Sequence, residues 1–356
     1  MSVSSPLDDE VFQRQSRRLG QVLVQGHVEA GAGQVEARVL CGARWLRRWR
    51  RWTPVPLTRA TGEFRGEVPA AAGGFYKVEV RVLEGSRVLA RDEVNHVGVG
   101  EVFVIAGQSN STNYGEVRQK TVTRMVSTFD GAGWRIADDP QPGVQDGSTK
   151  GSFVPAFGDA LYRRYRVPIG VASVGHGSTS VRQWLPAGEN VEVMPTMRKY
   201  VVRGSDGSLT SDGTLFHGLT ERMDELGAHG FRAVLWHQGE SDADQAPEHS
   251  ISPDTYRRMM EEVIVSYRRR AGWDVPWIVA EATYHSPSDP KCPPMRAAQR
   301  SLWKSGVALE GPDTDTLTAR YRQNNGKGVH FNDAGLKAHG ELWAQAVERY
   351  LNTVLR

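Results

Sequence analysis

The segment Glu101-Val102-Phe103-Val104-Ile105-Ala106 runs directly into Gly107-Gln108-Ser109-Asn110, and this junction decides the fold that we predict for the chain. The short apolar run predicts a strand, and the glycine and polar residues after it predict a tight turn. Such a turn exposes the Ser109 hydroxyl. Because serine is also common in turns without any chemical role, its meaning depends on partners elsewhere in the chain.

Beyond this junction the sequence alternates between strand and helix patterns. We predict helices at 156–166, 215–229, 256–270, 295–304 and 333–351, and strands at 168–174, 233–236, 277–282 and 307–309. This alternation predicts an α/β fold in which helices cover both faces of a parallel sheet. Ligands bind at the carboxyl ends of such strands, so the polar motifs at 107–110, 175–178 and 237–240 should converge on one crevice. The segments 129–152 and 186–214 lack clear structure and are candidates for its walls.

The first part of the chain has a different pattern. Apolar runs at 22–28, 35–40 and 75–83, separated by glycine-rich breaks, predict the short strands of a β-sandwich. The length of 356 residues also exceeds what one compact domain usually needs. We therefore predict an accessory β-sandwich of immunoglobulin or fibronectin type at 1–98 and a catalytic domain at 99–356.

Composition and charge narrow the class of protein. A net charge of +3 over 356 residues is too weak to argue for a nucleic-acid partner. No apolar run approaches the ~18 residues that a membrane span needs, so we expect no membrane partner. The polar segment 1–9 does not resemble a signal peptide. The location is therefore cytoplasmic, or periplasmic or secreted where an export signal has been removed; the oligomeric state stays open.

The two cysteines, Cys41 and Cys292, lie far apart and fit no metal-binding spacing. They can form at most one bridge, and we expect two free, mostly buried thiols. Since no ligand cluster with metal spacing is visible elsewhere, we expect neither a metal nor another cofactor.

The segment from Arg44 to Trp52 interleaves arginine with tryptophan. Such a segment can stack on sugars or bind an anionic polymer. We favour a β-hairpin that buries the tryptophans in the sandwich core, because arginine stems often cover apolar surface.

Two other segments supply candidate partners for Ser109. His330, just before the predicted last helix, is the candidate base that takes the serine proton; a structural loop histidine is the alternative. Asp333 is expected to cap that helix and fix the loop. Glu240 follows the strand at 233–236 and is the candidate acid, because a carboxylate there can orient the histidine and stabilise its charged form.

Acyl transfer also needs donors for a developing oxyanion. We predict three: the backbone N–H groups of Ser109 and Gly177, and the side-chain amide of Gln238. Donors of this kind are commonly worth about 3 kcal/mol each in transition-state stabilisation.

Taken together, these segments resemble the SGNH-type hydrolases, and more narrowly the sialate O-acetylesterase and carbohydrate-esterase group. The similar blocks are Gly107-Gln108-Ser109-Asn110, Gly177-Ser178-Thr179 with Trp184, His237-Gln238-Gly239-Glu240, Arg296-Ala297-Ala298-Gln299, Gly311-Pro312-Asp313-Thr314-Asp315 and the late histidine His330. The resemblance spans roughly 100–350, with the catalytic blocks in the expected order. It implies a flavodoxin-like three-layer α/β/α domain, and we further predict that Asn110, Trp184 and His237 contact the substrate.

The chain departs from the family pattern at two positions. Lys327 stands three residues before His330, where many relatives have Asp, so we assign the acid role to Glu240, with Asp313 or Asp315 as alternatives. Ser178 stands where a second glycine is usual, which affects local loop geometry.

The resemblance and the residues together predict a serine esterase. We expect it to remove O-acetyl groups from a polysaccharide, an oligosaccharide or sialic acid through an acyl-enzyme. The sugar and the acylated position stay open. Alternatives are an inactive carbohydrate-binding protein, or an acyltransferase or peptidase that uses the same three residues.

Overall fold

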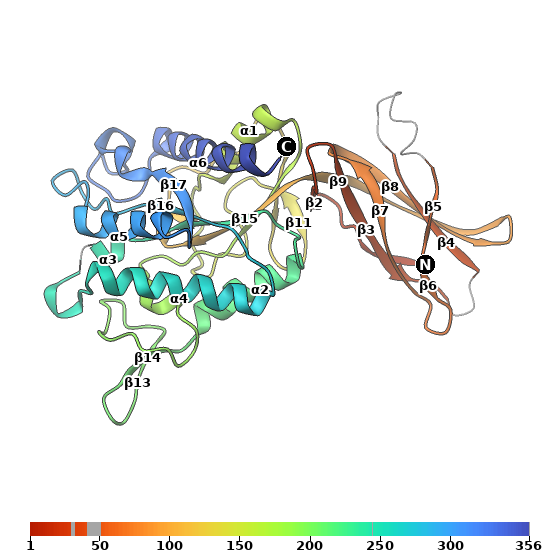
Figure 1. The fold of residues 1–356 in the computed structure, drawn as a ribbon. Coiled ribbons are helices and arrows are strands. Elements are labelled where there is room, and N and C mark those ends of the chain that lie inside the picture. The colour runs from red at the N-terminus through yellow and green to blue at the C-terminus, as the bar shows by residue number, and fades with distance from the viewer. Residues whose placement is uncertain (30–32, 41–50, 244, 356) are drawn as a thin grey trace.

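The computed structural model describes residues 1–29, 33–40, 51–243 and 245–355, arranged as a β domain beside an α/β domain (Figure 1). Cys41 and most of the arginine- and tryptophan-rich segment lie outside the described residues. Trp52, at the end of that segment, is half-buried between the guanidinium groups of Arg38 and Arg81, at 4.4 and 4.0 Å from the ring centre.

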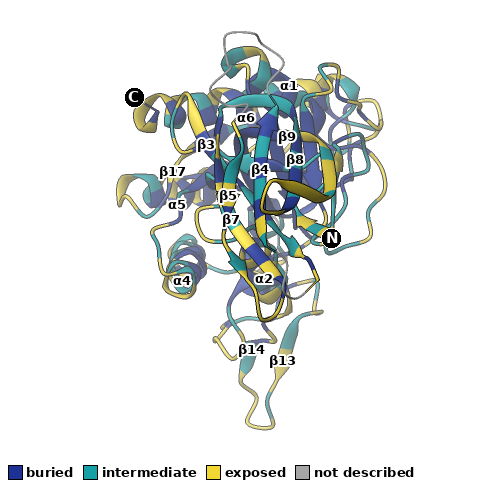
Figure 2. Cartoon of the chain, turned by 90° about the vertical axis from the view of Figure 1, so that its right-hand side faces the viewer, coloured by how far each residue is buried: buried dark blue, intermediate teal, exposed yellow. Residues whose placement is uncertain are grey.

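The β domain is a sandwich of two sheets, as predicted. One sheet is antiparallel, in the order β1 (Ser2–Ser5), β3 (Leu19–His27), β7 (Glu63–Ala71) and β6 (Leu57–Thr58). The other contains β5 (Thr53–Val55), β4 (Gln34–Leu40), β8 (Gly73–Glu84), the first half of β9 (Arg87–Gly107) and β2 (Val11–Gln13). Alternate residues of strands such as β4 are buried between the sheets, as the burial colouring of Figure 2 shows.

A single strand joins the two domains. β9 pairs with β8 up to Val99, and from Glu101 it pairs with the central strands of the α/β domain. The strand predicted at 101–106 is therefore the last part of a 21-residue strand. The change of neighbours thus falls between Val99 and Glu101.

The α/β domain contains the predicted parallel sheet. Its strand order is β11 (Trp134–Ile136), β10 (Val126–Phe129), β12 (Ile169–Ser173), β9, β15 (Ala233–His237), β16 (Trp277–Glu281) and β17 (Leu309–Asp313), with β11 antiparallel at one edge. From β9 the chain passes to β10 and the edge strand β11 on one side, returns to β12 beside β9, and then crosses to β15 on the other side. β9 and β15 therefore form a topological switch point, the place where open α/β sheets bind ligands.

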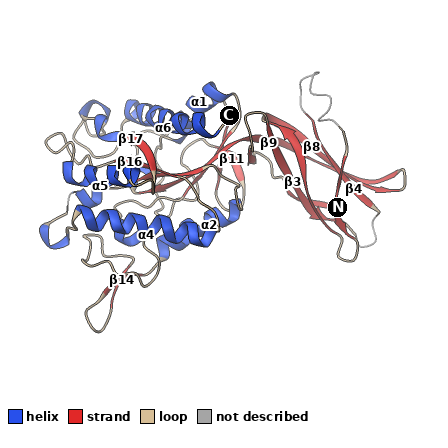
Figure 3. Ribbon diagram, in the orientation of Figure 1, coloured by secondary structure: helices blue, strands red, loops and turns tan. Residues whose placement is uncertain are grey.

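Helices cover both faces of this sheet, as predicted (Figure 3). The helices are α1 (Val154–Tyr165), α2 (Thr214–Leu226), α3 (Glu240–Ala243), α4 (Pro253–Ala271), α5 (Pro293–Lys304) and α6 (Asp333–Val354). Side chains alternate across β9, because successive strand residues point to opposite faces. Val102 and Val104 pack with α2, α4 and α5, whereas Phe103 and Ile105 pack with α1 and α6. Among the described residues, no helix is long and apolar enough to cross a bilayer.

Short elements occupy the remaining connections. They are η2 (Ser109–Ser111), η3 (Val181–Trp184), η4 (Pro247–His249), η5 (Thr314–Thr316), η6 (Ala319–Tyr321) and the two-stranded hairpin of β13 (Val201–Arg203) and β14 (Leu209–Ser211). The hairpin and β11 lie within the two segments that the sequence left without structure.

Helix α6 begins at Asp333, as predicted, but its capping residue differs from the prediction. Asn332, not Asp333, is its N-cap, because the Asn332 Oδ1 accepts the Gly335 N–H at 2.9 Å. Asp333 is the first helical residue and accepts hydrogen bonds from Gln119 and Lys337. The Asn332 amide also donates to the backbone oxygens of Arg320 and Arg322, so this cap fixes the loop that contains His330.

A buried ionic cluster lies where the domains meet. Glu101 is fully buried and accepts from Arg14 at 2.7 Å and from Arg232 at 2.8 Å. Gln13 also donates to it, at 3.0 Å. One carboxylate on β9 thus joins the end of β2 to the start of β15.

We predict that Glu101→Gln lowers the free energy of unfolding by about 3–5 kcal/mol, because it leaves two guanidinium groups with no counter-charge. Urea denaturation measures this change. The control is Glu93→Gln, which breaks an exposed pair with Lys77 and should cost no more than about 1 kcal/mol. Equal effects of the two substitutions would contradict the structural role of Glu101.

Candidate active site

Three strand ends meet at the carboxyl edge of the parallel sheet, as the sequence predicted. Gly107 at the end of β9 is paired with His237 at the end of β15. The Gln108 N–H donates to the His237 oxygen at 2.9 Å, and the His176 N–H, after β12, donates to the Gly107 oxygen at 2.9 Å. Gly107 has φ +124° and a Cβ there would lie 2.0 Å from the His237 oxygen, so only glycine fits.

A cleft of about 270 Å3 opens at this edge. It contains Ser109, Glu240 and His330, the three predicted catalytic residues. The other residues that line it are Gln108, Ser178, Thr196, Met197, Ser241, Gln245, His285 and Val329. Thr196 and Met197 belong to the predicted wall segment 186–214. The segment 129–152 does not line the cleft but supports it, as described below for Asp146 and Lys150.

Ser109 begins the short helical turn η2 directly after β9. Its side chain is nearly buried but faces the cleft. The first N–H groups of a helical turn have no acceptor within the turn, so the Ser109 N–H suits the predicted oxyanion role. The next residue, Asn110, donates to the Glu240 Oε1 at 2.9 Å and to the Val329 oxygen at 3.4 Å. Asn110 therefore connects the serine turn to the segments of the other two catalytic residues.

Gln108 has a role that the sequence did not indicate. Its side chain is buried, and its Oε1 accepts from the backbone N–H groups of Gly239 and Ser241 at 3.3 and 3.1 Å. It also accepts from the Gln238 amide at 3.3 Å. The residue before the nucleophile thus anchors the loop that contains Glu240. The position of Gln108, a polar residue between a buried strand and Ser109, was the only sequence feature that could have indicated this role.

Glu240 is almost fully buried, and its Oε1 has two partners. Asn110 donates to it, and the His237 Nε2 lies 3.0 Å away. Burial alone would raise the pKa of Glu240, but the His237 ring and the hydrogen bonds from His237 and Asn110 lower it below its ordinary value. The carboxylate is therefore charged and engaged with His237, not hydrogen-bonded to His330.

A buried chain of rings continues from His237. The His237 Nδ1 lies 3.1 Å from the His339 Nε2, which also accepts from the Trp343 Nε1–H at 3.0 Å. Because indole is only a donor, the His339 Nε2 accepts from Trp343. The His237 ring thus lies between the Glu240 carboxylate and the His339 ring, within hydrogen-bond distance of both.

His330 lies in a loop held by Arg322. This guanidinium is buried and donates to the oxygens of Leu317 and Val329, both at 2.6 Å, and of Thr314 at 3.3 Å. It also stacks between Tyr284 and Phe331. The ring of Tyr114 stacks on the His330 imidazole, with 5.0 Å between their centres.

Burial lowers the pKa of His330 to about 4. The Glu240 carboxylate raises it, whereas Arg322 and Lys150 lower it further. The imidazole is therefore neutral at physiological pH, the form that can accept a proton from a serine.

Two of the predicted oxyanion donors have other partners. The Gly177 N–H donates to the Asp146 Oδ2 at 2.7 Å. The Gln238 amide is fully buried and donates to Asp242 at 2.7 Å and to the Thr179 oxygen at 3.1 Å. Neither donor is free in this conformation. The structure therefore does not place the Gly177 N–H or the Gln238 amide as an oxyanion donor, contrary to the prediction. The sequence could not show these acceptors, because they come from distant segments.

The three predicted substrate contacts also need correction. Trp184 is fully buried and its indole donates to Thr179 at 3.0 Å, so it belongs to the core. His237 is buried between Glu240 and His339, and the Asn110 amide is used within the protein. None of the three lines the cleft. Each instead bonds to another residue of the protein: Asn110 and His237 to Glu240, and Trp184 to Thr179.

The alternative acids are excluded by their partners. Asp313 and Asp315 both bind Arg296, at 2.8 and 2.7 Å. Asp315 also accepts from the backbone of Thr283 and Tyr284. Within the part of the chain that the structure describes, no cluster of His, Cys, Asp or Glu side chains could hold a metal ion. Cys292 is a free, half-buried thiol.

Ser178 is the position at which the sequence departs from the expected second glycine. It is exposed at the cleft with φ +61°, a conformation that glycine adopts without steric cost. Lys327 is exposed in the loop before His330.

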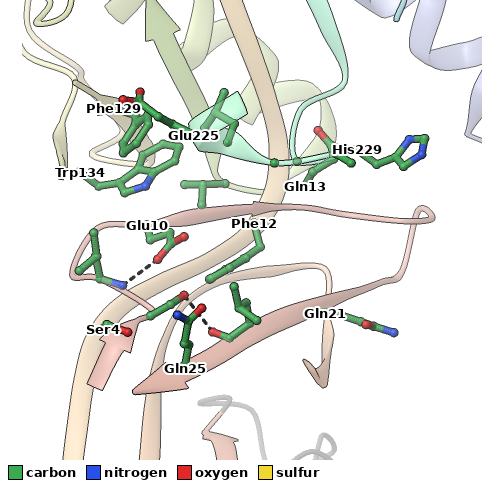
Figure 4. Close-up of a pocket in the computed structure, with 18 of the residues that line it drawn as sticks. Ser4, Glu10, Phe12, Gln13, Gln21, Gln25, Phe129, Trp134, Glu225 and His229 are labelled. Atoms are coloured by element: carbon green, nitrogen blue, oxygen red, sulfur yellow. Dashed lines mark hydrogen bonds between the residues drawn. The ribbon is translucent and has the colours of Figure 1, made fainter. Parts of the chain in front are cut away.

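A larger cavity, of about 690 Å3, lies between the two domains (Figure 4). Glu10 and Phe12 line it from the β domain, and Phe129 and Trp134 line it from the β10–β11 hairpin. Burial raises the pKa of Glu10 to about 7, although the Leu7 N–H lowers it in part. None of the three catalytic candidates lines this cavity.

Comparison with known proteins finds a matching family model and solved structures of similar fold. A family model described as carbohydrate esterase, sialic acid-specific acetylesterase, matches residues 99–349. A carbohydrate acetylesterase from Xanthomonas citri has a similar fold, with a TM-score of 0.56 at 17% identity over 96% of this chain and 73% of that one. A protein from Arabidopsis thaliana gives a TM-score of 0.50 at 18% identity over 70% and 98% of the two chains. No curated sequence matches the chain.

We predict that Gln108→Leu destabilises the fold, because it leaves the N–H groups of Gly239 and Ser241 without their acceptor. Each buried unsatisfied group costs about 1–3 kcal/mol, so the free energy of unfolding should fall by at least about 2 kcal/mol in urea denaturation. Gln345→Leu, on the surface of α6, is the control and should stay within about 0.5 kcal/mol. A neutral Gln108 variant would refute the anchoring role.

Proposed function

Because this chain belongs to the carbohydrate esterase family of sialic acid-specific acetylesterases, we propose that it removes O-acetyl groups from carbohydrate through an acyl-enzyme on Ser109. One observation carries the proposal. Ser109, His330 and Glu240 come from three distant segments, yet all three line one small cleft at the switch point of the sheet.

The reaction begins with proton transfer. His330 Nε2 takes the Ser109 hydroxyl proton as Oγ bonds to the ester carbonyl carbon, and the carbonyl oxygen becomes an oxyanion. The Ser109 N–H is the donor best placed for that oxyanion. As the intermediate collapses, the bond to the sugar oxygen breaks and His330 returns the proton to that oxygen. The acetyl group then remains on Ser109.

The second half uses water in the same way. His330 takes a proton from water as its oxygen bonds to the acyl carbon. The bond to Oγ then breaks, Ser109 regains a proton from His330, and acetate leaves. The nearby Glu240 charge favours the imidazolium that forms in both halves.

The size and polarity of the cleft support an acetylated sugar. About 270 Å3 is slightly below the ~300–1,000 Å3 of typical small-molecule pockets, which suits a short acyl group. Nine of its eleven lining residues are polar. Hydroxyl and amide side chains can hydrogen-bond sugar hydroxyls, whereas a lipid ester would favour an apolar wall.

We predict that Ser109→Ala abolishes the burst of p-nitrophenol from p-nitrophenyl acetate and the release of acetate from acetylated sugars. Acetate release across acetylated xylan, xyloglucan, pectin and O-acetyl sialic acid identifies the substrate. Ser266→Ala in α4, where the serine is half-buried and donates to Glu262, is the matched control and should keep full activity, because Ser266 does not line the cleft. Residual activity in a purified Ser109→Ala protein would refute the nucleophile, and faster transfer to a sugar acceptor than to water would indicate an acyltransferase.

The pH dependence tests the base. Only neutral His330 can accept the serine proton, so kcat/KM should stay level from neutral pH downward and fall only as pH drops through about 4, where His330 becomes protonated. Rates between about pH 3 and pH 8 with p-nitrophenyl acetate, with circular dichroism at each pH to confirm folding, measure this. An acid limb centred near the ordinary histidine pKa would contradict the buried environment of His330.

A further inference from the structure

The Nδ1 of His330 has a partner that the sequence did not indicate. It lies 3.0 Å from the Nε2 of the Gln323 side-chain amide, and the Gln323 backbone N–H donates to the His330 backbone oxygen at 2.9 Å. The adjacent residues Arg322 and Phe331 form a β-bridge. Gln323 and His330 are thus held side by side by the backbone as well as by their side chains.

A glycine makes room for this contact. A Cβ at Gly328 would lie 2.4 Å from the Gln323 Cγ and 3.2 Å from its backbone oxygen. The Gly328 N–H also donates to that oxygen at 3.0 Å. The loop therefore packs the Gln323 side chain against the bare backbone of Gly328, which leaves it little freedom to turn away from the imidazole.

A base in this position needs an acceptor at Nδ1. That contact fixes the tautomer in which Nε2 is free to take the serine proton. The nearby acids do not bind this atom in the structure. Asp313 and Asp315 bind Arg296. The Glu240 Oε1 accepts from Asn110 and lies 3.0 Å from the His237 Nε2, whereas the side-chain partner of the His330 Nδ1 is Gln323.

We propose that Gln323 is the positioning residue of His330 and accepts the Nδ1–H through its Oε1, in the place that a carboxylate has in Ser-His-Asp triads. This inference rests on the proposed function. A half-turn of the amide puts Oε1 where Nε2 lies, because both atoms occupy the same fork. In this arrangement the neutral amide of Gln323 orients His330, and Glu240 is the negatively charged group near its ring.

The charges around the imidazole agree with a neutral partner. The ionisable groups that face His330 are Glu240 from α3, Arg322 from its own loop, Lys150 from the segment before α1 and Tyr114, whose ring stacks on it. His285 lines the same cleft. A carboxylate at Nδ1 would add a second negative charge to Glu240 and would hold the pKa of His330 higher than the value of about 4.

The direct test is nitrogen NMR of the His330 ring, assigned by its loss in His330→Asn. At neutral pH the wild-type protein should show the proton on Nδ1. In Gln323→Leu the proton should distribute over both nitrogens. In Gln323→Glu the His330 pKa should rise by at least about one unit. A wild-type ring with its proton on Nε2, or an unchanged tautomer in Gln323→Leu, would overturn the proposal.

Activity gives an independent readout. Gln323→Leu should lower kcat for p-nitrophenyl acetate by about 100-fold, the cost typical of a misplaced catalytic group, with KM little changed. Gln323→Glu should restore kcat at neutral pH and move the acid limb of kcat/KM to higher pH. A merely structural glutamine would give neither the rescue nor the shift.

Gly328→Ala tests the same contact without altering Gln323. The added methyl group must displace the Gln323 side chain, so kcat should fall as in Gln323→Leu. Gly133→Ala is the control, since a Cβ there meets nothing within 4 Å, and should keep full activity. Full activity in Gly328→Ala would count against the proposal.

The two proposals fail differently. If the wild-type protein has no esterase activity, the proposed function falls, while the tautomer measured by NMR still tests the Gln323 contact. If the wild-type protein is active but Gln323→Leu keeps its kcat and its tautomer, the function stands and the positioning role falls.

Discussion

The parallel pairing of β9 with β15 places Gly107 against His237, and the rest of the site depends on this contact. Because the two backbones approach so closely, β9 must stop at a glycine, and the chain turns at once into Ser109. The same pairing sets the start of the loop after β15, which contains Glu240. Gln108 then joins the two loops through its buried amide. The nucleophile and the carboxylate are therefore positioned by backbone register.

Much of the fold and part of the site were predictable because they depend on local patterns. The apolar strand before Gly107 and the helical periodicity of 256–270 are properties of short windows, and both agree with the structure. Ser109 and Glu240 could be grouped because ligands gather at the carboxyl ends of parallel strands. His330 was added as the candidate base in the loop before the last helix. A strand was predicted at 101–106, whereas β9 runs from Arg87 to Gly107 and continues through both domains. The pairing with β8 that extends it depends on a distant segment.

The errors concern polar groups whose partners lie far away in the chain. Trp184 follows a family-like glycine block, yet its indole bonds to Thr179 inside the core. The amide of Gly177 has Asp146 as its acceptor, 31 residues earlier. Sequence alone shows which donors exist but not which acceptors the fold brings to them. Gln323 was overlooked for the same reason, since a glutamine in a loop has no pattern that marks it as a partner of His330.

In the proposed mechanism, the charges around His330 affect its two roles, as base and as acid, differently. Burial, Arg322 and Lys150 all disfavour the imidazolium, so His330 is a weak base toward the serine hydroxyl. The imidazolium, once formed, is correspondingly a strong acid toward the departing sugar oxygen. A sugar alkoxide is a poor leaving group and gains most from early protonation. A neutral amide at Nδ1 preserves this acidity, whereas a second carboxylate would reduce it. The buried cation of Arg322 and the proposed orienting amide of Gln323 therefore both keep the His330 imidazolium acidic. This acidity suits the cleavage of an unactivated sugar ester.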